Sequence, residues 1–267
     1  MNPLDLSLIC KQTRKLAREA GKFILEESKK FLSESIETKG KHDFVTYVDK
    51  GSEKKLVKGL QRILPGSGFI AEEGTYEKRD TQYIWIIDPL DGTTNFIHGL
   101  PPYSVSIALM EKQEIILGVV FEVVMDECFY SSKGGNAYLN EKEISVTKTK
   151  KVEDSLIATG FPFTNYDRLD PFLHSLKYFM MNSHGVRRLG SAAVDLVYIA
   201  CGRFDAFYEH NLNAWDVAAG AFIIKQAGGK VSDFSGGNNY LFGKEIVAAN
   251  SNIFDEFLSV VNNFMIS

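Results

Sequence analysis

The segment Trp85-Ile-Ile-Asp88-Pro-Leu-Asp91-Gly-Thr-Thr-Asn95 constrains the fold more than any other, because an apolar run ends abruptly in two acids three residues apart. Burial of an unpaired carboxylate is costly, so Asp88 and Asp91 leaving a hydrophobic strand together indicate a bound cation. Pro89 cannot donate a ladder hydrogen bond and disfavours helical geometry at Asp88, so we expect the strand to end there. A surface turn would suit the same letters, and the segment alone does not decide between the two interpretations.

The turn that follows these acids suits a phosphate. Gly92 permits a close approach of the backbone to a ligand, and Thr93 and Thr94 offer hydroxyl and N–H groups. This combination is typical of a hard metal ion beside a phosphate group.

Composition excludes several classes of protein. The 267 residues, 45% of them hydrophobic, are enough for one large domain or two closely packed halves. A formal net charge of −4 gives no electrostatic footprint for nucleic acid or an anionic membrane, so neither partner is expected. Three widely spaced cysteines, Cys10, Cys128 and Cys201, indicate neither a disulfide framework nor a zinc site. This cysteine usage fits a reducing cytoplasm, which is the location that we expect. We also expect no signal peptide and no membrane span.

Hydrophobic periodicity predicts a layered α/β chain, a single domain over 1–267 with a soft division near 145–150. Long amphipathic helices are expected over Leu4–Leu32 and Ser52–Leu64, with a polar loop over Lys39–His42 between them. A strand-rich block that can pair as an antiparallel meander follows, over 68–71, 83–87, 103–110, 114–124 and 127–131. The later chain alternates strands near 156–159, 186, 205–208 and 246–249 with helices near 171–180, 191–200, 215–226 and up to 262.

Three further acids stand at the ends of predicted elements. Glu72 follows a predicted strand, Asp49 lies near the start of the second helix, and Asp216 opens the helix that begins at Trp215. Each has an ordinary structural interpretation, as a solvated loop acid or as an acid in the first turn of a helix. Successive strands can nevertheless deliver their terminal acids to one edge of a sheet, where α/β folds commonly bind ligands.

The donor set favours Mg²⁺ or Mn²⁺ over zinc, because no histidine or cysteine accompanies the acids. A Gly-x-Ser-x-Gly elbow, a P-loop and a dinucleotide-binding glycine motif are all absent from the sequence. Carboxylate-bound metal beside a Gly-Thr-Thr turn is suited to polarising a phosphate and activating water. The residues therefore predict metal-assisted phosphomonoester hydrolysis, with these acids at its centre: Glu72, Asp88, Asp91 and Asp216.

The stretches from Trp85 to His98 and from Trp215 to Gly229 resemble the two signature motifs of the inositol monophosphatase family. Glu72-Glu73, the segment Asp43–Asp49 and Arg188-Leu-Gly-Ser-Ala-Ala193 match in order, so the resemblance covers nearly the whole chain. It implies a five-layered αβαβα sugar-phosphatase fold, a homodimer, two or three Mg²⁺ ions that Mn²⁺ can replace, and inhibition by Li⁺.

The same resemblance assigns the metal ligands and the water-activating groups. Glu72, Asp88 and the carbonyl of Leu90 would hold one ion, and Asp88, Asp91 and Asp216 a second, with Glu72 also touching a weaker third. Thr93, paired with Asp49, would orient and deprotonate the attacking water, with Glu72 assisting.

Substrate contacts are carried over in the same way. The N–H groups of Gly92 and Thr93 would bind the phosphate, and Lys39 stands where the family has a mobile-loop lysine. The wall facing the alcohol would consist of Asp91, Gly190, Ser191, Ala192, Glu209 and Asp216.

Selectivity is less constrained than metal chemistry. The loop between Glu73 and Asp88 is shorter than in animal members, and Arg187-Arg188 resembles bacterial members. The sequence favours an inositol-1-phosphatase acting on a small phosphorylated polyol or sugar. A fructose-1,6-bisphosphatase or a 3'-phosphoadenosine-5'-phosphate phosphatase shares the metal motif and is the alternative. A non-catalytic regulator or an accessory of the RNA machinery would not need all four acids.

Overall fold

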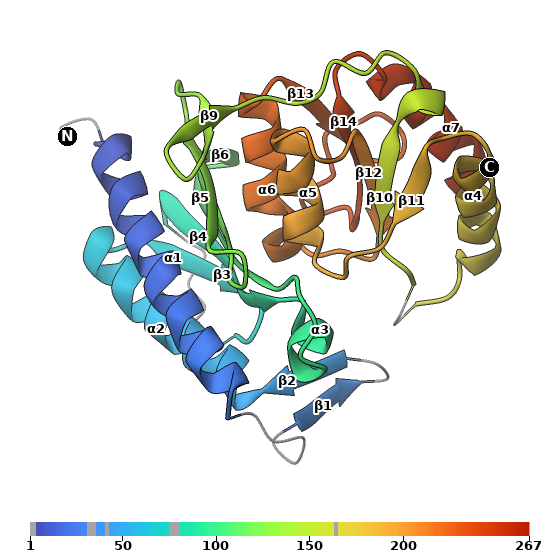
Figure 1. Ribbon diagram of the computed structural model, residues 1–267. Coiled ribbons are helices and arrows are strands. Elements are labelled where there is room, and N and C mark those ends of the chain that lie inside the picture. The colour runs from blue at the N-terminus through green and yellow to red at the C-terminus, as the bar shows by residue number, and fades with distance from the viewer. Residues whose placement is uncertain (1–3, 31–35, 41–42, 75–80, 163–164, 267) are drawn as a thin grey trace.

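The computed structural model describes residues 4–30, 36–40, 43–74, 81–162 and 165–266, with only the backbone described for 36–40 and 43–45. Helix pairs and sheets alternate in five layers (Figure 1), which confirms the predicted αβαβα architecture. Two helices cover the outer face of one sheet, two lie between the sheets, and two cover the outer face of the other. In that order the pairs are α1 (Leu6–Ser28) with α2 (Tyr47–Ile63), α5 (Ala192–Ala200) with α6 (Ala214–Gln226), and α4 (Leu169–Met181) with α7 (Phe254–Met265).

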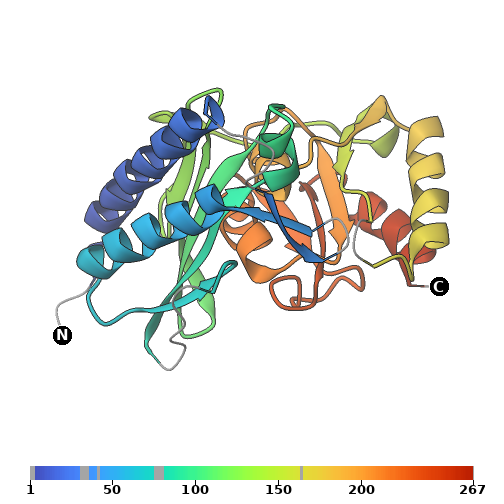
Figure 2. The same ribbon diagram turned by 90° about the horizontal axis from the view of Figure 1, so that it is seen from below.

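The first sheet has seven strands in the order β3-β4-β5-β6-β7-β8-β9. Every pair from β4 onward is antiparallel, as the predicted meander requires, whereas β3 departs from it by running parallel to β4. Figure 2 shows α1 and α2 lying side by side against this sheet. The strands are β3 (Gly68–Ala71), β4 (Tyr83–Asp91), β5 (Ser104–Glu111), β6 (Glu114–Glu122), β7 (Glu127–Ser132), β8 (Ala137–Leu139) and β9 (Lys142–Ile144).

The second sheet has five strands in the order β11-β10-β12-β14-β13. β10 is parallel to both of its neighbours, whereas β14 is antiparallel to β12 and β13. The strands are β10 (Leu156–Thr159), β11 (Gly185–Arg187), β12 (Ala206–His210), β13 (Gly229–Ser232) and β14 (Glu245–Asn250). A short 3₁₀ helix, η2 (Val152–Asp154), precedes β10.

The structure corrects the predicted end of β4. The strand continues through Pro89 to Asp91, and its pairing with β5 shifts register between Asp88 and Asp91. Such an irregularity leaves residues out of the ladder, so the missing N–H of Pro89 is tolerated there. Asp88 and Asp91 therefore belong to the irregular last part of β4 and do not follow a strand that has already ended.

The region before and within α2 also differs from the prediction. Lys39 and Gly40 belong to β1 (Ile36–Gly40), which pairs with β2 (Asp43–Thr46), so they are not in a loop. Residues 41–42 and the side chain of Lys39 lie outside the described residues. α2 begins at Tyr47 instead of Ser52, because Thr46 and Asp49 form a capping box. The short helix α3 (Thr93–Ile97), β8, β9 and β13 were not predicted.

The central helices pack closely on the seven-stranded sheet. One hydrophobic cluster includes Ile86 and Val120 of this sheet, Leu196 of α5, and Phe207 of the second sheet. At Gly118 of β6, an added Cβ would lie 2.8 Å from the carbonyl oxygen of Ala219 in α6. Glycine is therefore required for this approach of helix to sheet. Along the described part of the chain, every helix is too short or too polar to cross a membrane.

We predict that Gly118→Ala lowers the free energy of unfolding by about 1–3 kcal/mol, because the methyl group would meet backbone atoms of α6. Urea unfolding measures the change. Gly51→Ala in α2 is the matched control: its Cβ would meet only the tip of Phe23, and it gains helix propensity of up to about 1 kcal/mol. Equal destabilisation by both changes would contradict the packing account.

Candidate active site

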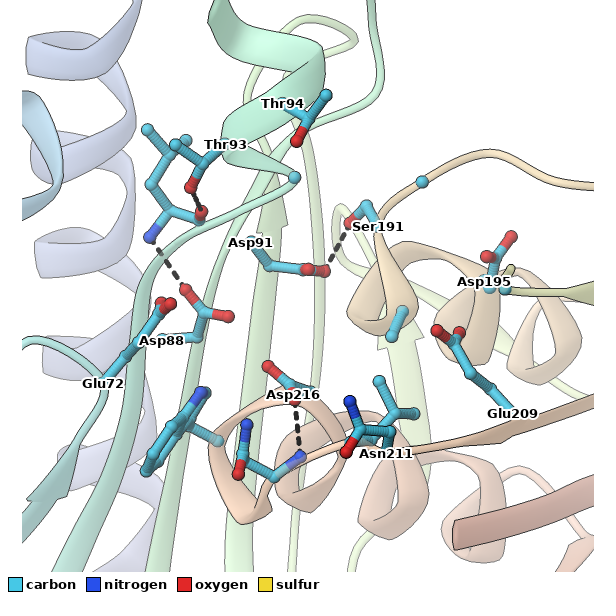
Figure 3. Close-up of a pocket in the computed structure, with 18 of the residues that line it drawn as sticks. Glu72, Asp88, Asp91, Thr93, Thr94, Ser191, Asp195, Glu209, Asn211 and Asp216 are labelled. Atoms are coloured by element: carbon cyan, nitrogen blue, oxygen red, sulfur yellow. Dashed lines mark hydrogen bonds between the residues drawn. The ribbon is translucent and has the colours of Figure 1, made fainter. Parts of the chain in front are cut away.

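A cavity of about 660 Å³ opens where β4 ends beside the N-termini of α5 and α6. Asp49 does not line it but lies buried behind Thr93, and the side chain of Lys39 lies outside the described residues. Figure 3 shows the acids of β3, β4 and α6 on one side of this cavity and Glu209 with Asp195 on the other. The predicted residues that line it are Glu72, Asp88, Leu90, Asp91, Gly92, Thr93, Gly190, Ser191, Ala192, Glu209 and Asp216.

The irregular end of β4 presents Asp88 and Asp91 to the cavity. Asp88 Oδ1 accepts a hydrogen bond of 3.0 Å from the N–H of Leu90. Asp91 Oδ2 accepts from the Ser191 hydroxyl at 2.5 Å and from the N–H of Ala193 at 2.8 Å. Ser191 is also the N-cap of α5. Asp91 therefore lies against the N-terminus of α5, where a helix favours negative charge.

Asp216 is both an acid in the first turn of a helix and an acid of the cavity, the two interpretations that the sequence left open. It is the acid in the capping box of α6, where its Oδ2 accepts a hydrogen bond of 2.6 Å from the N–H of Asn213. It also lines the cavity beside Asp88 and Asp91. The capping hydrogen bond holds this carboxylate at the N-terminus of α6, where it also lines the cavity, so Asp216 can cap the helix and take part in the site.

Asp49 likewise caps a helix and contacts the site. Its Oδ2 accepts hydrogen bonds from the N–H and the hydroxyl of Thr46, at 2.8 and 2.6 Å. Its Oδ1 accepts from the Thr93 hydroxyl at 2.8 Å, and that hydroxyl oxygen lies 3.0 Å from the carbonyl oxygen of Leu90. Only 1% of Asp49 is exposed. Its carboxylate is therefore fixed on both sides, with one oxygen reserved for Thr93.

Two glycines make room for the turn and its neighbour. Gly92 has φ +93°, and a Cβ there would lie 3.1 Å from the carbonyl oxygen of Pro102. Gly190 has φ +89°, and a Cβ there would lie within 3.0 Å of the Asn95 side chain. Both positions therefore favour glycine for conformation as well as space.

Mutual repulsion and burial dominate the electrostatics of the acids. Burial, followed by the negative charges of Glu72, Asp91 and Asp216, raises the pKa of Asp88 well above its usual range. Burial raises the pKa of Asp91 to about 6, although hydrogen bonds from α5 oppose the rise. Burial and then the charge of Asp91 raise the pKa of Asp216 to about 7. Burial and then Asp216 raise the pKa of Glu209 to about 8.

The donor set fits a hard divalent cation. All of these side chains offer oxygen atoms, and a cation would relieve the repulsion among them. Within the described ranges, no three His, Cys, Asp or Glu side chains are arranged to hold a metal ion as they stand. The carboxylates instead accept hydrogen bonds from Leu90, Ser191, Ala193 and Asn213. Ligation would therefore require these side chains to turn toward a common point.

The cavity also includes groups that the sequence did not assign to it. Asp195 of α5 is 1% exposed, and its Oδ1 has no hydrogen-bond partner. Burial, then the charges of Glu209 and Asp91, raise the pKa of Asp195 well above its usual range. In the sequence, Asp195 could have been identified as a candidate site residue because it is an acid within the otherwise apolar helix Ala192–Ala200. Thr94, which the sequence placed beside the phosphate, also lines the cavity. The other unassigned lining residues are Gly160, Pro162, Tyr166, Arg188, Asn211, Leu212, Asn213, Trp215 and Lys244.

A layered fold with an acid-lined cavity is suited to a phosphate-ester hydrolase, and comparison with known proteins agrees with the fold. The family model for "Inositol monophosphatase family" matches residues 5–264. The chain is 41% identical over 246 residues to an inositol-1-monophosphatase of Mesorhizobium japonicum, covering 92% of each chain. It is 40% identical over 250 residues to a protein of Pseudomonas aeruginosa called Nus factor SuhB, again covering 92% of each.

A solved structure, an inositol monophosphatase from Anabaena, superimposes with a TM-score of 0.86 at 32% identity and 98% coverage of both chains. The chain therefore belongs to the inositol monophosphatase family. It is a phosphomonoesterase.

We predict that, with a chelator present, the free energy of unfolding falls by a few kcal/mol between pH 5 and pH 8.5. The pKa values of Asp91, Asp216 and Glu209 are raised in the folded chain, to about 6, 7 and 8. Stability from such groups is complete below their ordinary values near 4 and is lost as the pH rises through the raised ones. Urea unfolding at the two pH values measures the difference.

Glu209→Gln should make this pH dependence shallower at its alkaline end, because it removes the acid with the pKa of about 8. Glu143→Gln, at an exposed position, is the control and should leave it unchanged. An identical pH dependence in wild type and Glu209→Gln would show that this carboxylate is not strained by burial.

Proposed function

We propose that this phosphomonoesterase is Mg²⁺-dependent and hydrolyses an inositol monophosphate to inositol and phosphate. The observation that carries the proposal is that Glu72, Asp88, Asp91 and Asp216 line one cavity with Thr93. The relative from Mesorhizobium japonicum bears the name inositol-1-monophosphatase, which supports the choice of alcohol.

The metal ligands are proposed as the family resemblance implies. Glu72, Asp88 and the carbonyl of Leu90 would hold one Mg²⁺, and Asp88, Asp91 and Asp216 a second, with Glu72 reaching a weaker third; Mn²⁺ could replace Mg²⁺. Bound ions supply a more acidic water and neutralise charge on the phosphoryl oxygens.

Thr93 and Asp49 orient the attacking water in this mechanism. Because the Thr93 hydroxyl donates its proton to Asp49, its lone pairs are left to accept a hydrogen bond from water. The carboxylate of Asp49 receives the proton that passes through Thr93, and Glu72 assists from the cavity side. The N–H groups of Gly92 and Thr93 hold the phosphate in line with that water.

The alcohol would occupy the opposite wall of the cavity, where backbone and acidic side chains can bond its hydroxyl groups. Glu209 fits there because Gly160 has no side chain: a Cβ at Gly160 would lie 1.9 Å from the Glu209 carboxylate. The residues proposed to bind the alcohol are Asp91, Gly190, Ser191, Ala192, Glu209 and Asp216.

We propose that the enzyme is a homodimer, as the family resemblance implies, and that it is cytoplasmic, as its cysteine usage suggests. Light scattering at micromolar concentration tests the dimer directly.

A second function is suggested by the relative named Nus factor SuhB, since 40% identity over 92% of both chains links the two proteins. An accessory role in the RNA machinery would then accompany catalysis, because the complete acid set argues against such a role being the only one.

Asp91→Asn is predicted to reduce kcat by roughly 10³-fold or more. The change removes the negative charge of a residue that is proposed both to bind Mg²⁺ and to face the alcohol. The fold should persist, since the amide oxygen can still accept from Ser191 and Ala193. Phosphate release from inositol 1-phosphate measures activity, and circular dichroism measures folding. Asp167→Asn, at an exposed position, is the control. Near-wild-type turnover in Asp91→Asn would refute the assignment.

A substrate panel tests the choice of alcohol. We expect kcat/KM to be highest for inositol 1-phosphate, compared with fructose 1,6-bisphosphate and 3'-phosphoadenosine 5'-phosphate. Activity should require Mg²⁺ and fall when Li⁺ is added. A preference for either of the other substrates would move the enzyme to that branch of the superfamily and leave the metal chemistry intact.

A further inference from the structure

Helix α2 carries a buried polar face toward the site. Asp49, Ser52 and Glu53 are 1%, 0% and 0% exposed. Their spacing of three and four residues places them on one side of the helix. Burial of polar groups is unfavourable unless each finds a partner, so this face calls for specific contacts.

Each of the three side chains holds a different segment that builds the cavity. Asp49 accepts a hydrogen bond from Thr93 at the start of α3. Ser52 donates one of 2.9 Å to the carbonyl oxygen of Pro89, between the two acids of β4. Glu53 Oε2 accepts one of 2.7 Å from the N–H of Glu73, which directly follows Glu72. One rigid helix therefore fixes the relative positions of three segments.

The contact of Glu53 bears most directly on the direction of the Glu72 side chain. The N–H of Glu72 donates to the carbonyl oxygen of Ile87 in β4 at 3.3 Å. The next N–H, that of Glu73, donates to Glu53. The peptide groups on both sides of the Glu72 Cα are thus held, one by the sheet and one by α2. Holding both planes restricts where the Cα–Cβ bond points, and Glu72 points into the cavity (Figure 3).

We infer that Glu53 is a positioning residue, which holds the Glu72 backbone so that its carboxylate can bind a divalent cation. This inference rests on the proposed Mg²⁺ dependence. Glu53 itself does not line the cavity, so it acts through the hydrogen bond to Glu73. Groups that orient a metal ligand typically change metal affinity 10- to 100-fold when removed.

The test is Mg²⁺ binding by isothermal titration calorimetry to wild type, Glu53→Ala and Glu53→Gln, with Mg²⁺-induced change in Tm as a second readout. Glu53→Ala should weaken Mg²⁺ binding by about 10-fold or more. Glu53→Gln should restore most of it, because its amide oxygen can accept the same hydrogen bond from Glu73. At saturating Mg²⁺, KM for inositol 1-phosphate should stay close to the wild-type value. Lys54→Ala, at an exposed neighbouring position on α2, is the control.

The outcomes separate the inference from the proposed function. Wild type without any Mg²⁺ binding would refute the proposed Mg²⁺ dependence itself. Wild-type Mg²⁺ affinity in a folded Glu53→Ala protein would overturn the positioning role, since a structural role alone would lower Tm and leave affinity unchanged. Equal losses in Glu53→Ala and Glu53→Gln would overturn it too, because charge and not the hydrogen bond would then matter.

Should Glu53→Ala not fold, Glu53→Asp serves in its place. It keeps the charge but draws the carboxylate back from the Glu73 N–H by about one C–C bond length. Weaker Mg²⁺ binding by Glu53→Asp would support the inference, and unchanged binding would overturn it.

Discussion

Six carboxylates line one cavity, and much of the structure around them serves to hold like charges close together. Like charges at short range in a poorly solvated site repel strongly, and burial adds to the cost. Each of three acids is met by donors from a different element: Asp91 by α5, Asp216 by the start of α6, and Asp88 by its own strand end. The site is therefore stabilised locally while the charges themselves remain strained, which is the usual exchange of stability for function.

The sequence predicted the layered fold and the gathering of the acids because both depend on local patterns. The limits of α6 agree with the prediction within one residue, because an uninterrupted run of small and apolar residues follows Asp216 in its first turn. Glu72 and Asp88 meet because β3 and β4 are parallel, with Ala71 paired to Ile87, so the residues that come next lie at the same edge. The sequence predicted that both strands lead into acids, whereas the parallel pairing that brings the acids together is seen only in the assembled sheet.

Other features depended on partners that the sequence does not display. The passage of β4 through Pro89 follows from its irregular pairing with β5, which only the assembled sheet determines. The strands β8 and β9 have three residues each, which is too few to show an alternating hydrophobic pattern that would distinguish them from loops. The early start of α2 did have a signal, since Thr46-Tyr-Val-Asp49 has the spacing of a capping box. Asp195 was missed because an acid in the first turn of a helix is ordinarily a dipole partner.

The N-termini of three helices offset part of the free-energy cost of burying the carboxylates, and typical energies show that most of this cost remains. Asp49 and Asp216 lie in the first turns of α2 and α6, and Asp91 bonds to the first turn of α5. Each helix end stabilises a nearby negative charge by about 0.3–1 kcal/mol, and by up to about 2 kcal/mol when partly buried. Three such ends cannot cancel the burial of several interacting acids, where the effective penalty is several kcal/mol for each ion. The pKa values of Asp91 and Asp216, at about 6 and 7, remain raised in spite of their hydrogen bonds. The proposed Mg²⁺ ions would relieve the repulsion and burial cost that the helix N-termini do not offset. The cost that lowers the stability of the metal-free fold therefore also favours metal binding.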